Sequence, residues 1–205
     1  NLSLKYFKKI YRDLDINFQK TFLESDLITE GHRLVDKLQQ KKVLIKSDGA
    51  IIANLEKYNL GVLPIIRSDG TALYPVADLA LAQKKFSLYP LTESIYIVDL
   101  RQSLYFKQLF KILELAGYRA KMTHLPYEFV TLPNGMMSSR SGNVITYQEL
   151  LEMAIEKAAT ETKSRHSNWS TKKIDQTAKK IALSIIKFEM IKVSANKIIV
   201  FDINE

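Results

Sequence analysis

The stretch LPNGMMSSRSGN, residues 132–143, combines side chains that could bind a polyanion. Residues 133–135 (Pro-Asn-Gly) and 141–143 (Ser-Gly-Asn) break regular structure at its two ends, so a loop is predicted here. Between these breakers lie two methionines, two serines and an arginine, residues 136–140. Such a loop either binds an anionic group through its hydroxyl and guanidinium donors or simply joins two elements.

A second group of polar residues is predicted at the carboxyl end of a parallel sheet, where α/β proteins bind their ligands. Gln102 directly follows the apolar run 94–100 (SIYIVDL), at the expected start of a helix. Tyr74 and Asp78 are four residues apart in a predicted helical turn, so they share one face. Each residue taken singly has an ordinary explanation, because such residues near a helix start are usually caps or half-buried core.

The elements that would position Gln102 form a strand–helix–strand unit. Residues 94–100 are typical of a buried strand, and 102–118 have helical spacing with a stop signal at Gly117. Residues 120–132 are predicted to be extended again. The short connections indicate a parallel crossover, which is almost always right-handed.

The chain before this unit is predicted to be helical and then to form hairpins. Apolar residues three and four apart indicate helices within residues 1–40. Asp-Gly dipeptides at 48–49 and 69–70 each lie between two apolar runs, which predicts two β-hairpins. Residues 74–86 are then predicted to be helical, with Pro75 suited to a first turn.

After the loop the pattern is mostly helical. Thr146 and Glu149 have the spacing of a capping box at the start of a helix. Residues 170–193 form a second long amphipathic pattern, and 197–205 end the chain with a short apolar run. The sequence therefore predicts an α/β part first and a mostly α part second, with a boundary near residue 145.

Composition restricts the classes of protein that this chain can belong to. Hydrophobic residues make up 46% of the 205 residues, so a sizeable core can form, and the lack of cysteine excludes disulfides and thiolate metal sites. Thirty Lys and Arg against twenty-two Asp and Glu give a formal charge of +8, which suits either an anionic partner or a solubilising surface. Residues 1–14 carry charges where a signal peptide needs an apolar run. We expect a cytoplasmic protein without a membrane partner.

The loop and its surroundings resemble arginyl-tRNA synthetases, which are class I aminoacyl-tRNA synthetases. Their second signature loop, written KMSKS for the class, commonly reads Gly-Lys-Met-Ser-Ser-Arg-x-Gly-Asn in this family. Six positions of the chain match that string: Met137, Ser138, Ser139, Arg140, Gly142 and Asn143. Residues 67–82, 98–118 and 124–133 resemble three further family segments, in order and with compatible spacing. The resemblance extends from about residue 25 to the C-terminus.

The resemblance implies an α/β fold: the second half of a Rossmann-like class I synthetase nucleotide-binding fold, followed by a mostly α-helical stem. Residues 1–60 would be a helical and hairpin connective-insertion region. Residues 61–145 would be the Rossmann-like catalytic half-domain, and 146–205 the helical stem that leads to an anticodon-binding domain outside this sequence.

For the amino acid, the resemblance assigns an arginine pocket to Tyr74, Asp78 and Gln102. A guanidinium is a planar fork of donors that a carboxylate meets with two parallel hydrogen bonds, so Asp78 is expected to be the main specificity contact. Tyr74 would add a phenolic hydrogen bond and a wall. Gln102 would hold the amino-acid end.

For ATP, the resemblance makes Ser138, Ser139 and Arg140 catalytic groups that close over the triphosphate. Donors aimed at the leaving pyrophosphate lower the barrier, because negative charge builds there. His124 and Met137 would lie near the adenine or ribose. Mg²⁺ would be held mainly by the ATP phosphates, with no protein side chain assigned as a metal ligand.

The chain departs from the family pattern at several positions. Met136 replaces the first lysine of the signature, and Tyr105 stands where the family often has histidine, so no role is assigned to it. The first class signature, His-Ile-Gly-His, has no counterpart among the only three histidines, His32, His124 and His166. We therefore interpret the chain as an internal fragment that would not aminoacylate alone.

The expected function is that of an arginine–tRNA ligase fragment. The full-length enzyme would use L-arginine, ATP and tRNA(Arg), would be monomeric, and would face tRNA phosphates with its basic surface. One alternative is a non-catalytic paralogue that binds RNA or a protein partner. Another is a class I synthetase for a different amino acid.

Overall fold

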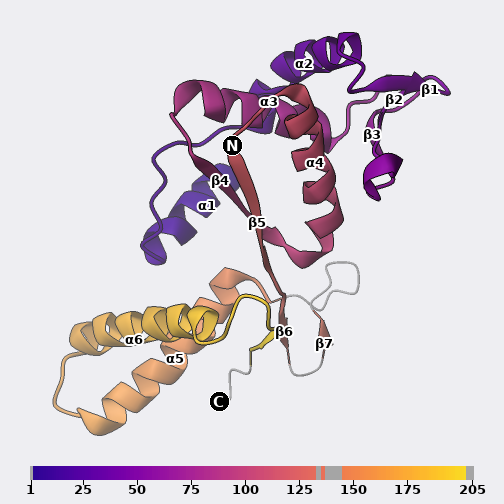
Figure 1. Ribbon diagram of the computed structural model, residues 1–205. Coiled ribbons are helices and arrows are strands. Elements are labelled where there is room, and N and C mark those ends of the chain that lie inside the picture. Colours follow the sequence, from indigo (N-terminus) through magenta and orange to yellow (C-terminus); the bar gives the residue numbers. More distant parts are fainter. Residues whose placement is uncertain (1, 133–134, 137–144, 202–205) are drawn as a thin grey trace. The chain divides into compact units, whose positions relative to one another are not determined.

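The structure is a computed structural model that describes residues 2–132, 135–136 and 145–201. It contains two compact units, each considered by itself below. Residues 20–126 form the α/β unit, and residues 1–19 with 127–205 form the hairpin unit (Figure 1). The division into 1–60, 61–145 and 146–205 stays a prediction.

The α/β unit alternates helices and strands along the chain, and the hairpin unit is dominated by two long helices (Figure 1). In the α/β unit the elements are η1 (Glu24–Asp26), α2 (Ile28–Gln40), β1 (Ile45–Ser47), β2 (Ala50–Asn54), η2 (Glu56–Tyr58), β3 (Val62–Ile66), α3 (Tyr74–Leu88), β4 (Glu93–Asp99), η3 (Leu100–Gln102), α4 (Ser103–Ala116) and β5 (Lys121–Tyr127). In the hairpin unit they are α1 (Leu2–Asp13), β6 (Val130–Leu132), β7 (Gly135–Met136), α5 (Tyr147–Arg165), α6 (Thr171–Ile191) and β8 (Ile199–Val200).

The first predicted β-hairpin is confirmed. Strands β1 and β2 pair antiparallel, and Asp48 and Gly49 between them have φ values of 49° and 82°. Two successive positive φ values are what a tight two-residue hairpin requires, and glycine adopts them without steric cost. Strand β3 then pairs antiparallel with β2 and completes a three-stranded sheet.

The second predicted hairpin forms only in part. Its turn is present, with the amide of Arg67 donating to the carbonyl of Thr71 at 2.9 Å. The two arms meet again at an antiparallel bridge between Ile66 and Ala72 and at a hydrogen bond from the amide of Leu73 to the carbonyl of Ile65 at 3.0 Å, but the second arm does not extend into a strand. Helix α3 begins at Tyr74, with Pro75 in its first turn as predicted, so no room remains for a second strand.

The predicted strand–helix–strand unit is present as β4, α4 and β5, with β4 and β5 paired. Near their starts the amide of Lys121 donates to the carbonyl of Thr92, and further along the His124 ring reaches the carbonyl of Val98. Because these contacts advance in the same direction along both strands, the strands are parallel. Helix α4 ends as predicted at Gly117, whose φ of 102° makes it a left-handed C-cap.

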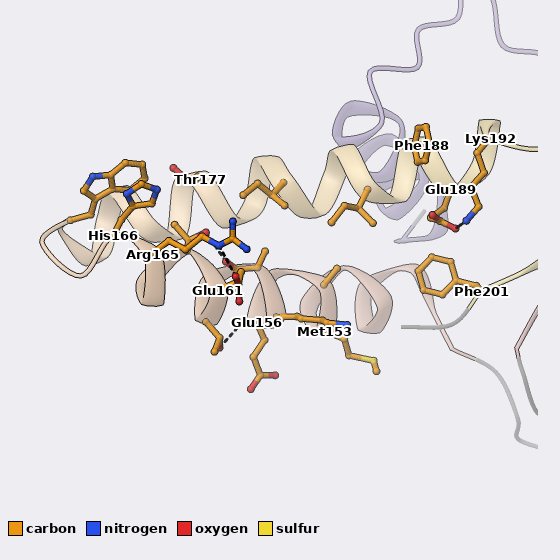
Figure 2. Close-up of a pocket in the computed structure, with 18 residues that line it drawn as sticks. Met153, Glu156, Glu161, Arg165, His166, Thr177, Phe188, Glu189, Lys192 and Phe201 are labelled. Carbon is orange, nitrogen blue, oxygen red and sulfur yellow. Dashed lines mark hydrogen bonds and ion pairs between the residues drawn. The ribbon is translucent and has the colours of Figure 1, made fainter. Parts of the chain in front are cut away.

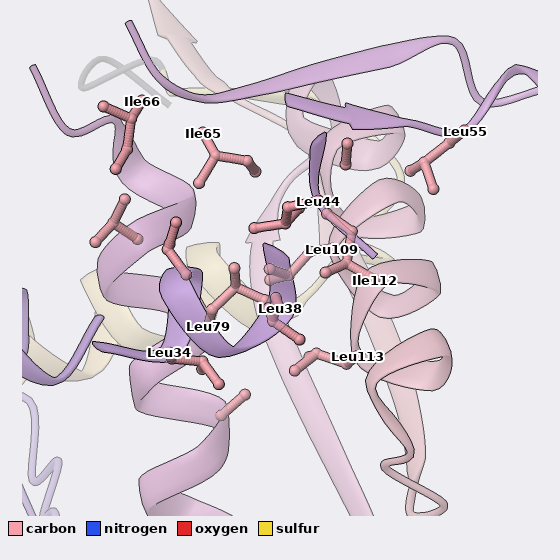
Figure 3. Close-up of a cluster of buried hydrophobic side chains, with 14 of the residues drawn as sticks. Leu34, Leu38, Leu44, Leu55, Ile65, Ile66, Leu79, Leu109, Ile112 and Leu113 are labelled. Carbon is pink, nitrogen blue, oxygen red and sulfur yellow. The ribbon is translucent and has the colours of Figure 1, made fainter. Parts of the chain in front are cut away.

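The core of the α/β unit lies where α2, α3 and α4 meet the sheet of β1–β3 (Figure 3). Each helix contributes apolar residues at helical spacing, and the strands add branched aliphatic side chains. The labelled members are Leu34, Leu38, Leu44, Leu55, Ile65, Ile66, Leu79, Leu109, Ile112 and Leu113. These contacts fix α3 and α4 relative to each other, which matters because both carry candidate site residues.

In the hairpin unit, α5 and α6 pack along their length around Leu151, Ala182 and Ile186. The predicted capping box is confirmed: the Thr146 hydroxyl accepts from the amide of Glu149, whose carboxylate accepts from the amide of Thr146. A small sheet in the order β7–β6–β8 accompanies the helices, with β6 antiparallel to β7 and parallel to β8. No helix in the described part of the chain is long and apolar enough to cross a membrane.

Candidate active site

A carboxylate and a tyrosine meet between α3 and α4. Asp78 lies one turn into α3 and is half-buried, and Tyr105 lies in the first turn of α4. The Tyr105 hydroxyl donates a hydrogen bond to Oδ2 of Asp78. The Tyr105 ring is also held edge-on by the neighbouring ring of Phe106, at 5.2 Å between centroids and 72° between planes. Sequence analysis assigned no role to Tyr105, yet its hydroxyl donates the hydrogen bond that Asp78 accepts within the described residues.

The electrostatics of this pair follow from its burial. Burial raises the pKa of Asp78, while the hydrogen bond from Tyr105 opposes that rise; Glu24 adds to it and Lys85 reduces it. Burial, and then the nearby Asp78 charge, raise the pKa of Tyr105, so its hydroxyl keeps its proton and acts as a donor at neutral pH. Within the described residues, Asp78 has no ion pair with a cation and no hydrogen bond on Oδ1.

Lys85, the cation of α3 that acts on the pKa of Asp78, makes its own contacts elsewhere. Lys85 follows Asp78 by seven residues, two helical turns, and is half-buried. Its ammonium donates to the Ser94 hydroxyl at 2.9 Å and lies 3.9 Å above the centre of the Tyr96 ring. Burial lowers the pKa of Lys85, and the Asp78 charge opposes that shift. Lys85 therefore moderates the charge on Asp78 without pairing with it.

Gln102 lies at the carboxyl end of β4, as predicted, but its described contact is with Asp99. Its amide nitrogen donates to Oδ2 of Asp99 at 3.0 Å, and both the backbone amide and Nε of Arg101 donate to Oδ1. These hydrogen bonds, from Arg101 first and Gln102 second, lower the pKa of Asp99. The sequence reasoning overlooked Asp99, although its position at the end of a parallel strand could have identified it.

His124 is half-buried on β5 and is fixed by two contacts. Its ring stacks on Phe106, with 4.9 Å between centroids and 23° between planes, and its Nε2 lies 3.0 Å from the carbonyl oxygen of Val98. A carbonyl only accepts, so this partner assigns the proton to Nε2. In neutral His124 the other nitrogen, Nδ1, is then left as an acceptor.

The structure thus brings some of the predicted site residues into polar contacts and leaves others exposed. Tyr74 begins α3 with 77% of its surface exposed, one turn before Asp78. No hydrogen bond in the described part of the chain joins Asp78 to Tyr74 or to Gln102. The four predicted loop residues lie outside the described residues: Met137, Ser138, Ser139 and Arg140.

A separate pocket of about 1130 Å³ lies between α5 and α6 in the hairpin unit (Figure 2). Trp169 and Phe188 line it, and none of the predicted site residues does. Two ion pairs lie among its charged side chains, Arg165 with Glu161 on α5 and Lys192 with Glu189 at the end of α6. A binding site needs polar groups left available to a ligand, so these paired charges do not make this pocket the better candidate.

Comparison with known protein families identifies the class of protein to which this α/β fold belongs. A family model described as "tRNA synthetases class I (R), catalytic domain" matches residues 1–203. The chain belongs to that family of class I tRNA synthetases.

Individual relatives carry a more specific name. An arginine–tRNA ligase from Bdellovibrio bacteriovorus is 37% identical over 206 residues, which are 99% of this chain and 36% of the relative. One from Clostridium perfringens is 34% identical over 207 residues, again covering 36% of the relative. The chain therefore spans about a third of the length of these curated relatives.

Solved structures share the fold. The arginyl-tRNA synthetase of Plasmodium falciparum superposes with a TM-score of 0.80 at 23% identity, over 98% of this chain and 34% of that one. The Thermus thermophilus arginyl-tRNA synthetase has a TM-score of 0.69 at 26% identity, over 89% of this chain and 36% of that one. At 23% identity, the likeness to the Plasmodium falciparum structure shows a shared fold and no more.

Proposed function

We propose that the protein to which this chain belongs is an ATP-dependent arginine–tRNA ligase that works in the cytoplasm. In this proposal the chain supplies the arginine pocket and the KMSKS-like loop. Family membership and the name shared by the relatives support the assignment. Since the chain spans only about a third of those relatives, the activity is proposed for the full-length protein.

The main support for the proposal is the burial of the Asp78 carboxylate without a cationic partner among the described residues. Its carboxylate is half-buried, and its hydrogen bond within the described residues comes from a neutral tyrosine rather than from a cation. A partly desolvated charge without an ionic partner favours a ligand that brings the opposite charge. The guanidinium of arginine suits this carboxylate, because it is always protonated and can donate two parallel hydrogen bonds.

The remaining residues have proposed places around the same substrate. Tyr74, one turn before Asp78, would form a wall beside the guanidinium. The amide oxygen of Gln102 would accept from the α-ammonium, with the Gln102 nitrogen held by Asp99. Arginine would then be recognised at both ends, which distinguishes it from lysine and from neutral analogues.

The proposed reaction has two steps. The carboxylate of arginine attacks the α-phosphorus of ATP, and pyrophosphate leaves as arginyl-adenylate forms. A terminal hydroxyl of tRNA(Arg) then attacks the activated carbonyl, and AMP leaves. Ser138, Ser139 and Arg140 would donate to the triphosphate during the first step, with His124 and Met137 near the adenosine.

Mg²⁺ is assigned to the phosphate oxygens of ATP rather than to the protein. Within the described residues no three His, Cys, Asp or Glu side chains gather in a group that could hold a metal ion. The cation would reduce the charge of the triphosphate as pyrophosphate leaves. The excess of thirty basic over twenty-two acidic residues would favour contacts with tRNA phosphates.

The test is ATP–pyrophosphate exchange by the protein expressed from the complete reading frame, with each amino acid offered in turn. Exchange that depends on arginine and on tRNA(Arg), and not on lysine or glutamine, is the expected result. Exchange with another amino acid would assign the protein to a different class I synthetase. RNA binding without exchange would indicate a non-catalytic paralogue instead.

A further inference from the structure

We propose that Tyr105 is a positioning residue for arginine recognition, which holds the Asp78 carboxylate in the orientation that receives the guanidinium. The inference rests on the proposed function and adds to it a residue that sequence reasoning left without a role. The hydrogen bond from the Tyr105 hydroxyl to Oδ2 of Asp78 is the geometry behind it.

The hydrogen bond leaves the carboxylate free to bind arginine. An ionised carboxylate offers about four acceptor positions on its two oxygens, and Tyr105 takes one of those on Oδ2. Among the residues that the structure describes, no other donor occupies Oδ1 or the second position on Oδ2. A guanidinium can therefore form its two parallel hydrogen bonds while the tyrosine remains in place.

Tyr105 is itself held firmly enough to act as a fixed donor. Its ring packs edge-on against Phe106, which is 5% exposed and also stacks on His124. One turn further along α4, Leu109 is fully buried in the core that joins α4 to α3. The donor and the carboxylate thus come from two helices whose relative position is set by packing. Such rigid support keeps a recognition group in its productive geometry.

The hydrogen bond has a second effect, on the charge of Asp78. The groups that act on this carboxylate are Glu24 of η1, Lys85 of α3 and Tyr105 itself, and the Asp78 charge in turn helps to raise the pKa of Tyr96 on β4. Burial raises the pKa of Asp78, and the donor on Oδ2 counteracts burial. Tyr105 therefore favours the ionised carboxylate that a guanidinium needs, in addition to orienting it.

The deciding variant is Tyr105→Phe in the protein expressed from the complete reading frame. It removes the hydroxyl and keeps the ring that packs on Phe106. We expect the KM for arginine in ATP–pyrophosphate exchange to rise about tenfold, the loss typical of one hydrogen bond to a charged group. The KM for ATP and kcat should change by less than about twofold, because the inference assigns the hydroxyl to the arginine side chain and not to ATP.

A pH profile separates positioning from a merely structural role. Without the hydroxyl, the pKa of Asp78 should rise further, so the acidic limb of kcat/KM for arginine should move to higher pH. The matched control is Tyr89→Phe, which removes a hydroxyl from a tyrosine that is 40% exposed at the end of α3. This control should leave both the KM for arginine and the acidic limb unchanged.

The outcomes distinguish the inference from the proposed function. If Asp78→Asn loses arginine-dependent exchange while Tyr105→Phe keeps the wild-type KM and pH profile, only the inference about Tyr105 is overturned. If Tyr105→Phe changes kcat and both KM values alike, the hydroxyl is structural, and the inference is again overturned. If the wild-type protein shows no arginine-dependent exchange at all, the proposed function and the inference both fail.

Discussion

Two carboxylates of the α5–α6 hairpin differ from one carboxylate of the α/β unit in the partners that they have. On the hairpin, Glu161 pairs with Arg165 at 2.6 Å and Glu189 with Lys192 at 2.7 Å. Asp78 of the α/β unit is half-buried and has no ion pair among the described residues. Charges already neutralised by neighbours belong to an ordinary surface, whereas a desolvated charge without a cation indicates a place for a ligand.

The hairpin pocket and the Asp78–Tyr105 pair also differ in the polar groups that they offer to a ligand. The hairpin pocket measures about 1130 Å³ and is lined largely by apolar side chains, such as Phe188, which is 61% exposed. Asp78 and Tyr105, by contrast, are polar groups whose pKa values burial raises. A ligand-binding site needs such polar groups to orient the ligand, and a large volume does not provide them.

Among substitutions in the two units, the largest loss of activity is expected at Asp78. Asp78→Asn keeps the shape of the side chain and removes its charge, so the guanidinium loses its ionic partner. We expect kcat/KM for arginine in the full-length protein to fall by about three orders of magnitude. Asp36→Asn, on the exposed face of α2, is the matched control and should behave as wild type. Equal activity of the two variants would contradict the assignment of Asp78.

The packing beneath the site should give the next largest effect. Leu109 is fully buried between α4 and the rest of the core, so Leu109→Ala leaves a cavity as well as losing apolar contacts. We expect the free energy of unfolding to fall by about 3 kcal/mol. Ile185→Ala, on the hairpin at 47% exposure, should cost less than about 1 kcal/mol. Urea denaturation measures both values, and similar losses would contradict the burial described here.

Removing the charge of Asp78 should stabilise the protein while it abolishes function. Burial raises the pKa of Asp78, so the stability present at low pH, where the group is protonated, is lost as the pH rises through the folded-state pKa. Asn cannot ionise. Without arginine present, Asp78→Asn should therefore unfold at a higher temperature than wild type at pH 7. Thermal melts at pH 7 and pH 3 should show this advantage only at pH 7.

The smallest effect is expected on the hairpin. Glu161→Gln breaks an exposed ion pair with Arg165, whose partners are 60% and 72% exposed. Such pairs contribute at most about 0.5 kcal/mol and are screened by salt. We expect no measurable change in kcat/KM for arginine and a small stability change that disappears at high ionic strength. A large loss of arginine activity would mean that the paired charges of the hairpin pocket have a role in the site.

Much of the fold follows from local sequence signals that the structure confirms. Asp48-Gly49 specifies a tight hairpin, Gly117 ends α4, and Thr146 with Glu149 starts α5. Each of these signals depends on backbone geometry within a few residues, so the sequence alone contains the physical cause. Pairing over a longer range was less predictable. After the turn at Asp69 the chain begins a helix where a second hairpin strand was expected.

The candidate site shows the same limit. Helical spacing and the end of a strand marked Asp78 and Gln102 only as polar candidates, and the resemblance to the family then assigned them to an arginine pocket. Asp78 and Tyr105 are 27 residues apart in the sequence and lie on different helices, so no local sequence pattern predicts their contact. The contact results from the packing of α3 on α4. The resemblance to the family showed only that Tyr105 stands where a histidine is common.

The most direct test of the central claim is to compare arginine with citrulline, which has the same shape but no charge on its side chain. Isothermal titration would measure the affinity of the full-length wild-type protein and of Asp78→Asn for both compounds. We expect wild type to prefer arginine by about a thousandfold or more, and Asp78→Asn to lose nearly all of that preference. A wild-type protein that binds both compounds equally, or an Asp78→Asn variant that still prefers arginine strongly, would contradict it.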